Sequence, residues 1–256
     1  MRYGRFLVLL EPIILLTLLE LTIFYPKYFY WLILLANFSI LLSIYTFFRE
    51  NRRGKSWPEF ASLAVLPVCF ISGTFVYASI ISNKFFLQTL FLVIVIFSYS
   101  HLRMAYKFFL DQDLLKKNFF KNQSGLGNLL AFFFSSAAIY GLQSFLNLPI
   151  WILMLFLLVI TALLVYQALW VNKIELRDAL LYVLVSSVVL LEIGWAATFL
   201  PLNYNVLGVS LTVCYYVLIR LVLSYLSNVL DGRRLKVYLS FGFLSILLVF
   251  LTSRWM

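Results

Sequence analysis

Residues 150–171 read IWILMLFLLVITALLVYQALWV and contain no charged side chain. A helix needs about 20 apolar residues to cross a hydrocarbon core about 30 Å thick, so this run is long enough to span a membrane. The run follows the short segment Asn147-Leu148-Pro149 and is itself followed by Lys173 and Arg177. These polar flanks delimit one predicted transmembrane helix.

Eight further stretches of this kind fill most of the chain. Hydrophobic residues make up 64% of the sequence and charged residues 12%, whereas a soluble domain is roughly half apolar and a quarter charged. We therefore predict an all-α fold, a polytopic transmembrane helical bundle of about nine spans that forms a single integral membrane domain over residues 1–256. The predicted spans are 6–24, 28–48, 59–82, 85–106, 126–146, 150–171, 179–200, 206–230 and 237–253.

The cationic residues predict how these spans are oriented. Sixteen of the twenty Lys and Arg residues fall at the N-terminus or in and beside every second connection. Lys27, Lys84 and Arg254 fall on the other side, and Arg220 lies within a span. Cytoplasmic loops retain Lys and Arg, so the pattern predicts a cytoplasmic N-terminus and an extracytoplasmic C-terminus. We expect a multi-pass protein of the bacterial cytoplasmic membrane.

The net charge of +10 is spread over five segments of the predicted cytoplasmic side. Nucleic-acid binding requires cations gathered on one surface, so we predict no nucleic-acid partner. Scattered basic residues beside spans favour anionic headgroups, which makes membrane lipids the expected partners. The sequence does not identify a protein partner.

Familiar catalytic and metal-binding motifs are absent from the sequence. The single histidine, His101, excludes a two-histidine metal site, and Cys69 and Cys214 lack a C-x-x-C arrangement. There is also no G-x-S-x-G elbow and no Walker A loop. We predict no metal and no cofactor, and an enzyme remains open only with an unfamiliar set of residues.

Ionisable residues inside the spans are the strongest functional candidates, because each costs about 2.5–3.5 kcal/mol at a helix centre and normally faces protein or water. Glu192 in the seventh span and Arg220 in the eighth lie at levels that differ by roughly 10 Å, so long side chains could bring them together. Glu20 is expected near the same side of the membrane. We predict a candidate ligand pocket at Glu192, Arg220, Glu20, Trp195, Tyr215 and Tyr216.

Each of these residues also has a purely structural interpretation. Glu192 could bond to a Ser, Tyr or Trp side chain, and Arg220 and Glu20 could extend toward the nearest interface. Glu11 is expected to pair with nearby cytoplasmic cations. His101 could be a proton relay, but the sequence favours an interfacial polar residue.

Two features are expected to hold helices together. Gln88, Gln143 and Gln167 can form hydrogen bonds between helices. The small residues Ala137 and Gly141 predict a close approach of another helix to the fifth span.

The segment Glu192 to Asn228 begins EIGWAATFLPLNYN and later contains CYYVLIR. It resembles uncharacterised multi-pass membrane proteins of small-genome bacteria. The resemblance implies no known activity and assigns no functional residue.

The leading hypothesis is the binding or transport of a small or amphipathic ligand through a polar intramembrane pocket. The alternatives are a structural or accessory membrane subunit and an unrecognised lipid-modifying enzyme. A fully paired Glu192 in a closed core favours the structural alternative, and a water-accessible cavity at Glu192 favours binding or transport. A cavity open to lipid with several converging polar groups favours an enzyme.

Overall fold

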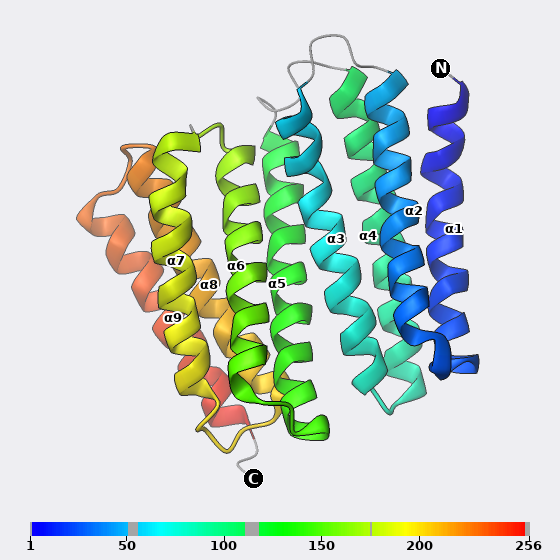
Figure 1. Cartoon of the computed structure of the whole chain (residues 1–256). Coiled ribbons are helices and arrows are strands. Elements are labelled where there is room, and N and C mark those ends of the chain that lie inside the picture. The colour runs from blue at the N-terminus through cyan, green and yellow to red at the C-terminus, as the bar shows by residue number, and fades with distance from the viewer. Residues whose placement is uncertain (1, 51–55, 111–117, 175, 254–256) are drawn as a thin grey trace. The chain divides into compact units, whose positions relative to one another are not determined.

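A computed structural model describes residues 2–50, 56–110, 118–174 and 176–253 of the chain. These residues form α-helices and one 3-10 turn, with no strand among them (Figure 1). The all-α prediction is therefore confirmed for the described residues. The elements are α1 (Arg2–Phe24), η1 (Pro26–Tyr28), α2 (Phe29–Glu50), α3 (Trp57–Ile80), α4 (Lys84–Leu110), α5 (Asn118–Leu146), α6 (Ile150–Val171), α7 (Leu176–Ala197), α8 (Tyr204–Leu226) and α9 (Gly232–Thr252).

Each of the nine α-helices in the described ranges contains a stretch long and apolar enough to cross a membrane. A multi-pass membrane protein is the architecture that this pattern supports, because backbone polar groups in hydrocarbon must be satisfied within the helix itself.

Polar residues at the helix starts cap backbone N–H groups that have no helical acceptor. Before α8, the Asn203 side chain accepts a hydrogen bond from the Asn205 N–H at 3.0 Å. Before α9, Asp231 accepts one from the Arg234 N–H at 2.7 Å. These caps place the helix starts at 204 and 232, a few residues before the predicted spans.

Tight turns join successive helices. Asn147 and Asn228 adopt positive φ angles of 47° and 54° directly after α5 and just after α8, a conformation that asparagine tolerates at helix C-termini. The helix ends that meet at the turns α1–α2, α3–α4, α5–α6 and α7–α8 are called the short-loop ends below. The sequence predicts these four connections on the extracytoplasmic side.

The contacts of the chain fall into two compact units, residues 1–127 and residues 128–256, with the boundary inside α5. The prediction of one integral membrane domain is not tested by this grouping. In unit 1, α1 packs against α2 and α4, and α3 packs against α2 and α4. Its core is rich in phenylalanine: the rings of Phe70 and Phe97 have centroids 4.1 Å apart.

Unit 2 contains the second part of α5 and the helices α6 to α9. Its sequential neighbours α6–α7, α7–α8 and α8–α9 pack together. The predicted close approach at Ala137 is confirmed, because a Cβ on Gly208 of α8 would lie 2.8 Å from the Ala137 Cβ. Tyr140 of α5 donates a 3.0 Å hydrogen bond to the Gly194 carbonyl of α7, so α5 is held against both helices.

Candidate functional site

Glu192 lies in an open groove between α6 and α7, in unit 2. The groove has a volume of about 460 Å³ and is lined by Ile150, Trp151, Met154, Leu155, Leu158, Leu191, Glu192 and Trp195. Glu192 is exposed, and among the described residues it forms neither an ion pair nor a hydrogen bond. The groove therefore combines one unpaired carboxylate, two indole rings and aliphatic walls.

The helix boundaries place this carboxylate near a membrane interface. α7 ends at Ala197, five residues after Glu192, which puts Glu192 about 8 Å from the short-loop end of the helix. Trp151 is the second residue of α6, so it lies at the same end. Tryptophan is enriched at the headgroup level of membranes, which agrees with a groove that opens near that level.

Arg220 is too far along α8 to meet Glu192. It follows the first residue of α8, Tyr204, by sixteen positions, or about 24 Å. Glu192 and Arg220 therefore differ by about 16 Å in level rather than roughly 10 Å, because α7 ends earlier and α8 begins earlier than their predicted spans. The two residues form no ion pair in the described part of the chain. Instead, the exposed Arg220 guanidinium carbon lies 5.3 Å from the centre of the Tyr216 ring.

Tyr215 belongs to the core of unit 2 rather than to a groove. It is 1% exposed, its ring stacks on Phe132 with centroids 4.2 Å apart, and its hydroxyl donates to the Asn128 side-chain oxygen. The Asn128 amide group donates 2.8 Å hydrogen bonds to the Gln167 side-chain oxygen and to the Leu164 carbonyl. The prediction that Gln167 links helices is thus confirmed.

Tyr216 and Glu20 complete the set of predicted site residues. Tyr216 contacts Phe241 of α9, with ring centroids 5.6 Å apart. Glu20 is half-buried on α1, in unit 1, where no hydrogen bond or ion pair holds it among the described residues. Of the six predicted residues, the α6–α7 groove brings together Glu192 and Trp195.

Glu11 has partners other than those that the sequence predicts. It is 2% exposed, and its two carboxylate oxygens lie 2.7 Å from Ser39 Oγ and 3.0 Å from Ser43 Oγ of α2. We expected cytoplasmic cations as its partners. The signal for this contact is the Ser-x-x-x-Ser spacing of Ser39 and Ser43, which places both hydroxyls on one face of α2.

A second buried polar group in unit 1 centres on His101 of α4. The imidazole is 3% exposed and stacks on Phe97, with ring centroids 6.1 Å apart. Among the described residues, neither ring nitrogen has a hydrogen-bond partner of ordinary geometry, and the buried hydroxyls of Ser98 and Ser124 also lack one. His101 is therefore buried inside unit 1, and its position near a membrane interface stays a prediction.

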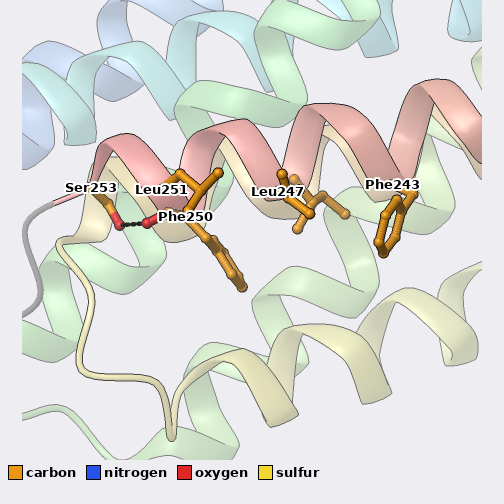
Figure 2. Close-up of a pocket in the computed structure, with 6 residues that line it drawn as sticks. Phe243, Leu247, Phe250, Leu251 and Ser253 are labelled. Carbon is orange, nitrogen blue, oxygen red and sulfur yellow. Dashed lines mark hydrogen bonds between the residues drawn. The ribbon is translucent and has the colours of Figure 1, made fainter.

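Another hollow, about 470 Å³ in volume, follows one face of α9 in unit 2 (Figure 2). Its lining is apolar apart from Ser253, whose hydroxyl donates to the Phe250 carbonyl at 2.9 Å. α9 exposes large apolar side chains along most of its length, including Phe243 and Leu251. Such a face suits contact with lipid acyl chains and offers no group that would orient a ligand.

No family model, curated protein or solved structure matches this chain at a significant level.

Proposed function

We propose that this chain is a multi-pass protein of a bacterial cytoplasmic membrane, with its N-terminus cytoplasmic, that binds or transports an amphipathic cation. The site is the α6–α7 groove, and the ligand class is an ammonium group attached to an apolar chain. The observation that carries the proposal is the unpaired Glu192 carboxylate in a groove with Trp151 and Trp195.

The chemistry of the groove supports a cationic head group. A carboxylate attracts an ammonium ion, and indole faces add cation–π attraction that strengthens when the cation is desolvated. No Lys or Arg of the described residues lines the groove, so the charge of Glu192 is available to a ligand.

The walls of the groove support an apolar tail. Met154, Leu155 and Leu158 continue along α6 away from the short-loop end. A ligand with its head at Glu192 would place its chain along these residues, parallel to the lipid acyl chains. Within the described part of the chain, Glu192 is the one ionisable side chain that lines the groove. An enzyme requires several converging polar groups, so binding is the better supported function.

The test uses the full-length protein in nanodiscs of a neutral lipid. Binding of an alkyltrimethylammonium amphiphile is followed by quenching of tryptophan fluorescence, with a sugar-headed and a sulfate-headed amphiphile of equal chain length as comparisons. The ammonium compound should bind best, and Glu192→Gln should weaken its binding about tenfold, the effect of losing about 1.4 kcal/mol of charge-assisted attraction.

Glu20→Gln is the matched control, since it removes another unpaired carboxylate within a predicted span but outside the groove. Equal binding of all three amphiphiles, or equal loss in the two variants, would refute the proposed site. A Glu192→Gln protein that binds normally but loses a co-purifying membrane protein would favour the accessory-subunit alternative.

A further inference from the structure

Glu11 occupies a position where a permanent negative charge is costly. It lies inside the apolar stretch Phe6–Phe24 of α1, and among the described side chains its contacts are the hydroxyls of Ser39 and Ser43. Two neutral donors compensate only part of the cost of burying a carboxylate without a cation. A bound proton removes that cost.

The hydrogen-bond pattern around Glu11 accommodates this proton. Ser39 Oγ lies 2.7 Å from the Glu11 carboxyl oxygen Oε1 and 3.0 Å from the Ala36 carbonyl oxygen, yet a hydroxyl has a single proton to donate. When Glu11 is protonated, the acid donates to Ser39 and Ser39 donates to Ala36. When Glu11 is ionised, Ser39 donates to the carboxylate instead, so one hydroxyl rotation satisfies either state.

The unpartnered polar groups of unit 1 lie at about the same depth as Glu11. α2 and α4 run in the same direction (Figure 1), and the rings of Phe47 and Tyr106 meet with centroids 5.4 Å apart. Ser39 precedes Phe47 by eight residues and Ser98 precedes Tyr106 by eight, so Ser39 and Ser98 lie at one level. α1 itself packs against α4, which brings the Glu11 level next to that of Ser98.

Ser98 and His101 are one turn apart on α4, and α5 supplies the third group. The Gln123 side chain donates to Ser100 Oγ, and α4 and α5 run in opposite directions (Figure 1). Ser124, the next residue of α5, therefore lies level with Tyr99, between Ser98 and His101. All three side chains are at least nine-tenths buried, and within the described part of the chain none of them forms a hydrogen bond of ordinary geometry. Buried hydroxyl and imidazole groups of this kind are normally satisfied by water.

Two prolines inside helices lie near Glu11 and His101. Pro12 is the eleventh residue of α1 and Pro67 the eleventh residue of α3, and each removes the N–H that the carbonyl four residues earlier would use. For Pro67 that carbonyl belongs to Leu63, whose backbone lies close to the His101 ring. An additional acceptor therefore lies beside the unpartnered imidazole.

We propose that unit 1 contains a proton-exchange site within the membrane, in which Glu11 binds the proton and His101, Ser98 and Ser124 hold the water through which it exchanges. On release, the O–H bond of the Glu11 acid breaks and the proton passes to water, leaving the carboxylate bonded to Ser39 and Ser43. The other titratable groups near this depth on the helices packed against α1 are Tyr45, Tyr99 and Arg103, and none of them forms an ion pair with Glu11. The site is independent of the α6–α7 groove.

Infrared spectroscopy of the full-length protein in lipid tests the proton-binding step. Protonated Glu11 should give a carboxylic-acid C=O band that disappears as the pH rises and is missing in Glu11→Gln. Glu11→Asp, which keeps the acid, should restore a shifted band, and Glu20→Gln should leave the band unchanged. Absence of a Glu11-dependent band from mildly acidic to mildly alkaline pH would overturn the proposal.

The exchange step is measured in the same samples as the rate at which the band shifts after transfer to heavy water. His101→Phe removes the imidazole but keeps an aromatic ring beside Phe97. It should slow the exchange about 10²-fold, the lower end of the range for a lost proton-transfer group. Thr74→Val is the control, since Thr74 is equally buried but bonds within α3. Equal exchange rates in His101→Phe and the unaltered protein would refute the role of His101.

Discussion

The two units bury polar side chains in different ways. In unit 2, the amide and phenol groups of Asn128, Gln167 and Tyr215 bond to one another in a buried network. In unit 1, two of the buried polar side chains are ionisable, those of Glu11 and His101, and among the described residues the imidazole has no hydrogen bond of ordinary geometry. A satisfied neutral network fixes a packing arrangement, whereas a carboxyl and an imidazole can change charge. The comparison indicates that the network of unit 2 holds its helices together and that unit 1 buries the carboxyl and the imidazole that can change charge.

The helices of the two units also differ in their internal prolines. α1 and α3 of unit 1 each carry an internal proline, which weakens the helix at that point. Helices α6 to α9 and the second part of α5 contain no internal proline, and α5 and α8 meet at the contact between Ala137 and Gly208. Close backbone contact leaves little room for either helix to move.

The largest loss of stability is predicted for a substitution that disrupts the contact between α5 and α8 in unit 2. In Gly208→Leu, the new side chain would meet Ala137 backbone atoms at 3.0–3.1 Å, and backbone cannot rotate aside. We expect a loss of about 3 kcal/mol, the upper part of the range for overpacking, measured as unfolding of the full-length protein in mixed micelles. Gly125→Leu is the control, because nothing lies within 4 Å of a Cβ added there. Similar losses for both variants would show that the α5–α8 contact is not specific.

A smaller loss is expected from the polar network of unit 2. Tyr215→Phe retains the stack on Phe132 but leaves the buried Asn128 oxygen without its donor, which should cost about 1–2 kcal/mol in the same assay. Tyr225→Phe is a matched control on α8, since Tyr225 is exposed. If the two substitutions have the same effect, the network does not stabilise unit 2.

The sequence predicts the helices of this protein better than it predicts its site. Runs such as residues 150–171 determine spans because hydrocarbon thickness leaves few alternatives. The Glu192–Arg220 distance, in contrast, depends on helix ends: Asn203 caps α8 and α7 stops at Ala197, and these shifts of two or three residues change the separation by several ångströms. The sequence correctly predicts that Trp195 lies beside Glu192, because Trp195 follows it by one helical turn on the same face of α7.

The buried groups of unit 1 were harder to predict for a different reason. Hydropathy places Glu11 near the end of a span, and a long side chain there can reach either water or the interior. Which of these occurs depends on the partner helix, and Ser39 and Ser43 decide it. Likewise, His101 faces the interior because Phe97, one turn earlier, packs against Phe70, a contact between helices that the sequence of α4 does not contain.

His101 should therefore behave oppositely to Tyr215. Because His101→Phe breaks no hydrogen bond to protein, we expect its unfolding free energy to stay within about 1 kcal/mol of the unaltered protein. The same unfolding assay compares it with Tyr215→Phe, which removes one polar atom rather than a whole imidazole. A larger loss for His101→Phe would mean that the imidazole is a structural element of unit 1, and the contrast between the units would fail.

The smallest effects belong to the exposed charges of unit 2. Arg220→Gln removes the contact with the Tyr216 ring and should cost about 0.5–1 kcal/mol, the value of a cation–π pair at an exposed site. Glu192→Gln should cost less still, because Glu192 has no partner to lose among the described residues.

If Glu192 and Arg220 attracted each other at long range, Arg220→Gln would have a smaller effect in a Glu192→Gln background than alone. We expect the two losses to add, since about 16 Å of helix separates their levels. Additivity would also show that a changed ligand affinity in Glu192→Gln arises in the groove itself.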